Sequence, residues 1–304
     1  MTVISELKRE SGFFSTFFFT MNHFIYCKKN EITFKLQSNE WFYKSEKGWE
    51  DYFVPVDLQF SDTNNEETII ASHGKVLCKY PIYEYKNILF DIYTYNQRTK
   101  DKIHETKTRL GLSEYGSIFI RRGEKLIFES KLYETHKYIE MLLDKYPTCK
   151  HVFLQTDDYN CFIELQDYIE DKKLDIKVST LCHEDMRGVY LSDNLVNQGT
   201  NISRNQHYIQ KIHREPRQTL AVANMNPTQI YDHTMDMIVG LDIVFNSEYC
   251  ITDYQSNVSR FIKLAHKNFD NVFDMDGFEL DLNCEICPSY PESVYTNPDN
   301  WRHT

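Results

Sequence analysis

The clearest alternation of hydrophobic and polar positions begins near residue 113. Short apolar runs of strand length alternate from there with segments whose apolar residues recur at helical spacing. The runs that predict strands are SIFI (117–120), HVFLQ (151–155), LDIKVSTL (174–181) and YCITD (249–253). The segments that predict helices are 132–146, 160–173, 228–245 and 256–268. Strand and helix alternating in this way indicate parallel βαβ units.

Two of these helices have polar residues suited to cap their first turn. Asp158 or Asn160 stands before the second helix, and Ser256 opens the last one. The segment from about residue 1 to residue 100 is aromatic-rich and less periodic. Alternation in EITFKLQS (31–38) predicts a strand, and the stretch NEWFYKSEKGWEDYF after it predicts a loop anchored by Trp41 and Trp49. We therefore expect two halves, 1–112 and 113–304.

Composition and charge narrow the class of partner. Among 304 residues, 34 Lys and Arg stand against 45 Asp and Glu, a net charge of -11, which disfavours nonspecific binding to nucleic acid or anionic membranes. The aromatic run near the start is too short to span a bilayer and lacks the features of a signal peptide, so we expect a cytoplasmic protein. Eight scattered cysteines contain one CxxC pair, Cys284 and Cys287, so free thiols in a reducing compartment are expected and no zinc site.

Polar residues follow three of the predicted strands. They are Arg121-Arg122, Asp157-Asp158 and Gln255-Ser256-Asn257. Ligands bind beyond the carboxyl ends of parallel strands, so the three loops should meet on one rim. A guanidinium fork and a helix amino terminus both suit phosphate, and together they predict a diphosphate site that needs no metal. The alternative for an arginine pair is a solvated or salt-bridged surface.

A carboxylate close to such a site could accept a proton. Glu129 lies four residues after Lys125 and could act as a general base on an incoming hydroxyl, although a plain surface salt bridge fits equally well. Asp274 and Asp276 form a DxD of the kind that holds a metal in many nucleotide-sugar transferases. Their place before Gly277 favours a turn instead.

These motifs resemble those of the α1,2/α1,6/protein O-fucosyltransferase superfamily, and above all the α1,6-fucosyltransferases that modify N-glycans and their bacterial relatives that act on chitin oligosaccharides. The likeness runs over roughly 12–276. It rests on SNEWFYKSEKGWEDYFVPV (38–56), IFIRRGEKLIFES (118–130), HVFLQTDD (151–158), RGVYL (187–191) and CITDYQSNVSRF (250–261).

The resemblance implies a GT-B-like fold of two Rossmann-like α/β halves, the first on the acceptor side and the second binding the donor. It also implies inverting, metal-independent transfer of fucose from GDP-fucose to a glycan hydroxyl, with no cofactor. By resemblance, Glu129 is the catalytic carboxylate with Lys125 as its partner, and Arg121 holds the β-phosphate. The other residues that match donor-side positions are Arg122, Tyr138, Asp157, Asp158, Asp242, Ser256 and Asn257, with Asp236 as the second candidate for reading the base.

The chain also departs from the family pattern. Phe119 stands where the family commonly has a histidine that contacts the donor base, and Glu124 replaces an aspartate. Gly12 alone remains of a glycine-rich loop. A different nucleotide sugar, or a non-catalytic protein that binds glycans or nucleotides, therefore stays an alternative. The missing membrane anchor, stem and SH3-like domain of the animal enzymes predict a soluble bacterial or viral relative.

Overall fold

The protein divides into two compact units. The computed structural model describes residues 1–8, 12–60, 67–72, 74–122, 133–184, 186, 225–254 and 256–285. The first unit comprises 1–102, 222–235 and 280–303, and the second comprises 103–221, 236–279 and residue 304. Helices α3 (Gln97–Leu110) and α10 (Pro227–Phe245) each begin in the first unit and end in the second. We expected one boundary at 112–113, whereas contacts place the first crossing within α3 and return the chain to the first unit twice.

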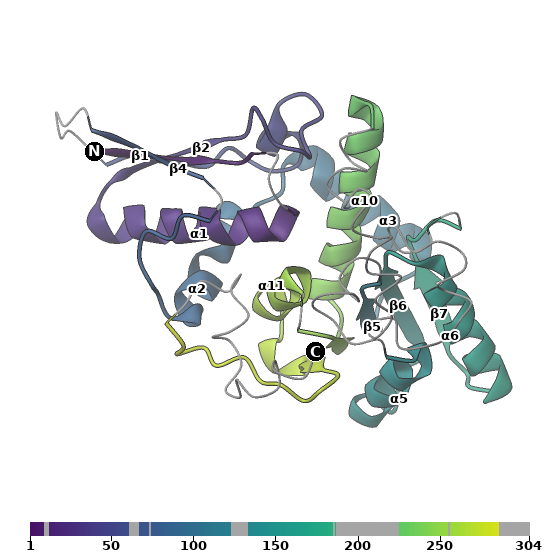
Figure 1. Cartoon of the computed structure of the whole chain (residues 1–304). Coiled ribbons are helices and arrows are strands. Elements are labelled where there is room, and N and C mark those ends of the chain that lie inside the picture. The colour runs from purple at the N-terminus through teal and green to yellow at the C-terminus, as the bar shows by residue number, and fades with distance from the viewer. Residues whose placement is uncertain are drawn as a thin grey trace, which may run out of the picture. The chain divides into compact units, whose positions relative to one another are not determined.

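The first unit is built on a four-stranded sheet in the order β3-β2-β1-β4. Its strands are β1 (Thr2–Glu6), β2 (Thr33–Gln37), β3 (Asp57–Leu58) and β4 (Thr68–Ala71). β1 runs parallel to β2 and β4, while β3 is antiparallel to β2. Helix α1 (Phe13–Asn30) joins β1 to β2 and lies along one face of the sheet, and α2 (Ile82–Ile92) packs on α1 (Figure 1). The strand predicted over 31–38 is confirmed as β2.

The sequence pattern did not predict α1, and its burial explains why. Thirteen of its eighteen residues are buried, including Asn22 and His23. The Asn22 amide donates to the Cys78 carbonyl and the Tyr85 hydroxyl at 2.7 Å and 2.8 Å, which satisfies this polar group inside the unit. A helix that is covered on nearly every side has no polar stripe, so its sequence shows no amphipathic period.

The loop predicted to carry anchoring tryptophans is confirmed. Trp41 and Trp49 are buried, and the Trp49 ring stacks on Phe53 with centroids 4.1 Å apart. A short 3-10 helix, Gly48–Asp51, ends the loop. The Asp51 carboxylate accepts backbone N–H groups from four consecutive residues, 45–48, which fixes the loop's path.

The second unit contains a parallel sheet in the order β7-β6-β5-β8-β9. Its strands are β5 (Gly116–Ile120), β6 (His151–Thr156), β7 (Lys177–Thr180), β8 (Cys250–Thr252) and β9 (Val272–Asp274), and its other helices are α5 (Thr135–Lys145), α6 (Tyr159–Asp171), α11 (Asn257–Ala265) and the 3-10 turn Phe269–Asn271. The four predicted strands and four predicted helices are confirmed here, with ends shifted by a few residues.

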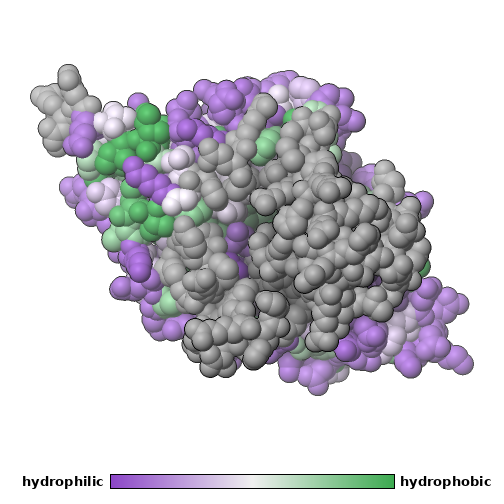
Figure 2. Space-filling view, in the orientation of Figure 1, coloured by the Kyte–Doolittle hydropathy of each residue, from purple (hydrophilic) through white to green (hydrophobic). Residues whose placement is uncertain are grey.

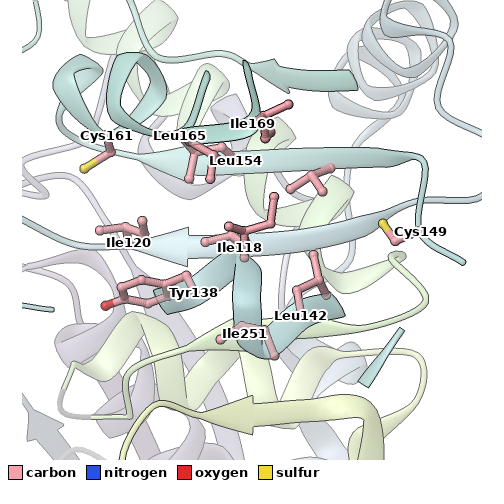
Figure 3. Close-up of a cluster of buried hydrophobic side chains, with 12 residues drawn as sticks. Ile118, Ile120, Tyr138, Leu142, Cys149, Leu154, Cys161, Leu165, Ile169 and Ile251 are labelled. Carbon is pink, nitrogen blue, oxygen red and sulfur yellow. The ribbon is translucent and has the colours of Figure 1, made fainter. Parts of the chain in front are cut away.

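A buried apolar cluster holds α5 and α6 against this sheet. Ile118 and Ile120 of β5 face Tyr138 and Leu142 of α5, with Ile251 of β8 alongside (Figure 3). Leu154, Cys161, Leu165 and Ile169 extend the cluster toward α6. Because the strands are short and their side chains interlock with two helices, the ends of β5, β6 and β8 are fixed relative to one another.

Apolar atoms also gather on the surface of the first unit. In the view of Figure 2 they lie over the region of β1, β4 and α1, while most of the other coloured surface is hydrophilic. Ile70 of β4 is 57% exposed and pairs in register with Ile4 of β1. The sheet thus has one face against α1 and an apolar strip on its other face.

Candidate functional site

The carboxyl ends of three neighbouring strands bring the predicted loops together. β5 lies between β6 and β8, so the residues after Ile120, Thr156 and Thr252 occupy one edge of the sheet. Direct contact confirms this for the first two loops, because the backbone N–H of Arg122 donates to Asp157 Oδ1 at 2.7 Å. The convergence expected from strand order is therefore found in the second unit.

Arg122 faces the interior of the unit. Its side chain is 8% exposed, and its two terminal nitrogens donate to the Glu164 carboxylate of α6 at 3.2 Å and 2.9 Å. The second nitrogen also donates to Thr135 Oγ1 of α5 at 2.9 Å, and the Thr135 hydroxyl donates in turn to Glu164. Burial opposes ionisation of Glu164, but Arg122 outweighs it and lowers the pKa of that carboxyl. Arg122 thus ties β5 to both helices.

Arg121 lies beside Asp157 instead. Its Nη1 is 4.0 Å from Asp157 Oδ2, and the side chains are 16% and 11% exposed. Burial raises the pKa of Asp157 to about 6, although the Arg121 charge and the Arg122 N–H both oppose that shift. The pair therefore combines a guanidinium with a carboxyl group that gains a proton more readily than usual.

Asp158 serves the helix that follows it. It is fully buried, adopts extended backbone angles as the N-cap of α6, and accepts the Asn160 N–H at 3.0 Å. Its other oxygen lies 3.9 Å from Arg122 Nη1. Of the two capping candidates, Asp158 is confirmed and Asn160 is not the cap.

The loop between β8 and α11 forms the third part of the rim. Ser256 caps α11 as predicted: its Oγ accepts the Ser259 N–H at 3.1 Å, and the residue is 2% exposed. Asn257 Oδ1 accepts from Arg260 Nη1 at 3.0 Å. A helix amino terminus therefore stands at the end of β8, which is the backbone arrangement that suits an anion.

Tyr138 connects the rim to the core. Its ring belongs to the apolar cluster of Figure 3 and is 3% exposed. Burial raises the pKa of Tyr138, with the negative charge of Asp253 contributing and the Arg122 charge opposing. The hydroxyl group thus lies within electrostatic reach of the loops after β5 and β8, and it remains neutral at ordinary pH.

Asp242 and Asp236 occupy different ends of the sheet. Asp242 pairs with Lys107 of α3 at 2.8 Å and lies close to Tyr115, which precedes β5 at the amino end of that strand. Asp236 is 3.6 Å from His183, which follows β7 on the rim side. Asp236 therefore lies toward the rim, where the other predicted residues are, whereas Asp242 lies toward the opposite end of the sheet.

The DxD motif is a turn. Asp274 is buried, and its two carboxylate oxygens accept hydrogen bonds from the backbone N–H groups of Tyr254, Asp276 and Phe278, at 2.6 Å, 2.8 Å and 3.2 Å. Gly277 has φ of +75°, the left-handed conformation that glycine tolerates. The turn interpretation is confirmed.

Three of the residues singled out from the sequence cannot be placed in the site. Lys125 and Glu129, as well as Gln255, lie outside the described residues. Thr135, Glu164 and Arg260 were not among the residues predicted from the sequence. Only their positions in the sequence could have suggested them: Glu164 lies on a predicted helix, and Arg260 lies within the motif CITDYQSNVSRF (250–261).

The described residues contain neither a cluster suited to a metal ion nor a helix suited to a membrane span. No group of three or more His, Cys, Asp or Glu side chains in them is placed to hold a metal ion. No helix in the same part of the chain has the length and apolar character needed to cross a bilayer.

Two α/β units, the second with its rim at the carboxyl ends of a parallel sheet, are the features expected of a GT-B-like fold, and that fold class is confirmed. A structure of NodZ α1,6-fucosyltransferase soaked with GDP-fucose matches with a TM-score of 0.51 and 12% identity, over 87% of this chain and 92% of that chain. The structure of fucosyltransferase NodZ from Bradyrhizobium matches with a TM-score of 0.53 and 12% identity, over 90% and 95% of the two chains. No protein-family model and no curated protein sequence matches this chain. The chain therefore has the fold of these fucosyltransferases, as its motifs predicted.

Proposed function

We propose that this protein is an inverting glycosyltransferase that transfers fucose from GDP-fucose to a hydroxyl group of a glycan. One observation carries the proposal: Arg121 and the amino terminus of α11 follow adjacent strands, β5 and β8, of a parallel sheet. Both features bind phosphate, and the fold is shared with a fucosyltransferase structure that was soaked with GDP-fucose.

Each residue of the rim has a distinct role in this proposal. Arg121 would pair with the β-phosphate, while Ser256 and Asn257 would present the amino-terminal N–H groups of α11 to the diphosphate. Asp157 is poised to orient Arg121, whereas Arg122 and Asp158 hold the loops in place from the inside. Tyr138 would line the donor side, and Asp236, not Asp242, is the better placed of the two aspartates for the base.

The reaction is a single displacement. The acceptor oxygen forms a bond to fucose C1 as the bond from C1 to the diphosphate oxygen breaks, which inverts the configuration at C1. The hydroxyl proton passes to Glu129, with Lys125 as the partner of that carboxylate, and the bond's electron pair leaves with GDP. Charge that develops on the leaving diphosphate is stabilised by Arg121 and the α11 terminus, so we expect the reaction to continue in excess EDTA.

The proposed donor is tested by a panel of nucleotides. Melting temperature is measured with GDP, UDP, GDP-fucose and UDP-linked sugars, because a ligand that binds the native state stabilises it by about 2.7 kcal/mol at a hundredfold excess over Kd. We expect stabilisation by GDP and GDP-fucose. Stabilisation by UDP compounds alone would overturn the GDP-fucose assignment.

One observation favours a nucleotide sugar other than GDP-fucose as the donor. Phe119, which stands where the family has its base-contacting histidine, is 6% exposed in β5, and its neighbours Ile118 and Ile120 point to the opposite face of the sheet. A phenyl ring offers no hydrogen bond to a guanine. Another GDP- or UDP-linked sugar is therefore the second candidate, and the same panel distinguishes it.

A further inference from the structure

We propose that Gln155 is a specificity-determining residue of the donor site, where its side-chain amide forms hydrogen bonds with the nucleobase. This inference rests on the proposed function, which assigns a nucleoside diphosphate to the rim of the second unit. Gln155 is the last residue but one of β6 and lies two positions before Asp157, and none of the roles proposed above includes it.

Gln155 lies beside Phe119, its register partner in the parallel pairing of β5 with β6. Their neighbours Ile118 and Leu154 belong to the apolar cluster that packs against α5 and α6 (Figure 3). The side chains of Phe119 and Gln155 therefore point to the opposite face of the sheet. Helix α10 lies on that face, because a Cβ built on Gly240 would overlap Gln155 Oε1. A ring and an amide are thus placed side by side near the carboxyl ends of two adjacent strands.

A glycine in α10 makes room for this amide. Gly240 lies in the interior of the helix, where glycine is less favourable than other ordinary residues because it loses more conformational entropy on folding. A Cβ at this position would overlap the Gln155 amide at both Oε1 and Cδ. The amide therefore occupies space that a side chain on α10 would otherwise fill, and the helix is weaker for it.

The amide gains no hydrogen bond for its oxygen at this place. Gln155 Oε1 is enclosed, and no group in the described part of the chain donates a hydrogen bond to it. A buried amide oxygen without a partner destabilises the folded state. The residue as a whole is nonetheless partly exposed, although Leu154 and Thr156 on either side of it are buried. Solvent therefore reaches part of this side chain near the end of β6.

Two destabilising features thus meet at the edge of the sheet where ligands bind. An apolar side chain of similar size at position 155 would avoid the unsatisfied oxygen, so packing alone does not account for a glutamine. Departures from local rules of stability are expected at functional sites. Gln155 precedes the loop that carries Asp157, and Asp157 lies beside Arg121. The amide is therefore close in the fold to the proposed diphosphate site.

The chemistry of an amide matches the edge of a guanine. Gln155 offers a donor and an acceptor side by side, and guanine offers the complementary pair in N1–H and the O6 carbonyl. Because Oε1 has no partner among the described residues, turning the amide toward a base breaks no hydrogen bond of that oxygen. Asp236 lies one turn before Gly240 on the same side of α10, where a carboxylate suits the 2-amino group of guanine. Phe119 adds apolar surface beside the amide.

The test measures affinity for nucleotides and for a bare diphosphate separately. Kd for GDP, UDP and inorganic pyrophosphate is measured by calorimetry in the full chain, together with the melting temperature. Gln155→Leu keeps most of the side-chain volume but removes the amide. We expect Kd for GDP to rise at least tenfold in this variant, as loss of a two-point contact to a base implies. Kd for pyrophosphate should change less than twofold, and the melting temperature should stay the same or rise.

Ser117→Ala is the matched control for folding. Ser117 lies two residues before Phe119 on β5, so its side chain is on the same face but further from the carboxyl end, and its Oγ is hydrogen-bonded to Ser247 Oγ at 2.8 Å. We expect this variant to lose melting temperature and to bind GDP within twofold of the unmodified protein. Equal losses of GDP affinity in Ser117→Ala and Gln155→Leu would show a general effect of packing and overturn the inference.

Gly240→Ala tests the placement of the amide from the opposite side. The added methyl group displaces the Gln155 amide, so Kd for GDP should rise several-fold. The same change made in Gln155→Ala should cause no further rise, because no amide is left to displace. A rise of the same size in both backgrounds would contradict the proposed contact.

The choice of ligands separates this inference from the proposed function. If Gln155→Leu binds GDP as tightly as the unmodified protein does, the inference fails and the proposed function stands. If the unmodified protein binds UDP in a Gln155-dependent manner but does not bind GDP, the amide's role stands and the GDP-fucose assignment fails. If it binds neither nucleotide more tightly than pyrophosphate, both proposals fail.

Discussion

Both terminal nitrogens of the Arg122 guanidinium donate to the carboxylate of Glu164, at 3.2 Å and 2.9 Å, inside the second unit. The arginine beside it in the sequence, Arg121, lies by Asp157 on the rim. Two adjacent and chemically identical residues therefore have different roles, because successive side chains at the end of a strand point to opposite faces.

Substitution should separate the two arginines. We expect Arg122→Ala to lower the free energy of unfolding by roughly 3 kcal/mol, because it removes the buried guanidinium that lies 3.9 Å from the Asp158 carboxylate and 2.9 Å from the Glu164 carboxylate. Arg121→Ala should cost less than about 1 kcal/mol of stability but weaken GDP binding by about 100-fold, as expected for a charge-assisted contact. Urea unfolding and calorimetry measure the two effects. Equal losses of stability would contradict the assignment.

The raised pKa of Asp157 makes a prediction about pH. The pKa of Asp157 in the native state is about 6, against 3.8 for an ordinary aspartate. Because the native state binds the proton more tightly than the unfolded chain, protonation of Asp157 stabilises the fold fully below pH 3.8, and this contribution is lost as pH rises through 6. Asp157→Asn keeps an oxygen for the Arg122 N–H but cannot ionise. Relative to that of the unmodified protein, the free energy of unfolding of the variant should therefore increase by ~1–3 kcal/mol as pH rises from 4.5 to 7.5.

Urea unfolding at the two pH values measures this difference. Asp175→Asn serves as the control, since Asp175 is an exposed carboxylate on Lys150. A difference between Asp157→Asn and the unmodified protein that is the same at both pH values would show that Asp157 does not titrate as described.

His23 predicts a pH dependence of the opposite sign in the first unit. Burial lowers its pKa to about 4, and the neutral ring is bonded to Ser5 Oγ and the Lys75 carbonyl at 2.8 Å and 2.7 Å. The unfolded chain binds the proton more tightly, so stability is lost as pH falls from 6.5 toward 4. His23→Gln should flatten this decline by about 2 kcal/mol, as the shift in pKa implies.

Melting temperature between pH 4.5 and pH 7.5 measures the effect of His23→Gln. His104→Gln alters an exposed histidine and should leave the decline unchanged. If both variants decline like the unmodified protein, another group causes the acid sensitivity.

Gly48 is required where the short 3-10 helix of the tryptophan loop begins. Its φ is +79°, and a Cβ at this position would lie 2.6 Å from the Ser38 carbonyl oxygen. Gly48→Ala should therefore destabilise the protein by more than about 2 kcal/mol, as strain and overlap combine. Gly74→Ala is the matched control, since Gly74 has φ of +86° and open space around its Cβ, and only the strain of about 1 kcal/mol applies. Similar losses in the two variants would exclude the steric contribution.

Glu129 is the predicted base for the transfer step. Glu129→Gln should leave GDP affinity within twofold and reduce the rate of transfer by about 10²–10⁴, the usual contribution of general base catalysis. Glu124→Gln, a change of the same kind nearby in sequence, should retain activity. Full activity in Glu129→Gln would remove that residue from the mechanism.

The candidate site could be predicted in part because its loops follow regular elements. The strand SIFI and the strand HVFLQ set the positions of Arg121 and Asp157, and the capping role of Ser256 follows from a polar residue just before an apolar helical pattern. The partners of Arg122 could not be predicted in the same way. Glu164 and Thr135 come from two different helices, 42 and 13 residues away in the chain.

The sequence alone determined the alternation of strands and helices in the second unit, the caps of α6 and α11, and the meeting of polar loops at one edge of the sheet. These properties follow from local periodicity and from the rule that parallel strands end at the same edge. The tertiary structure decided that α1 is a helix, that Arg122 points inward, that Asp236 and not Asp242 lies toward the rim, and that Arg260 reaches back to the start of its helix. Burial erases the amphipathic period of α1, and ionic partners are chosen by packing between distant elements, so no local pattern records either.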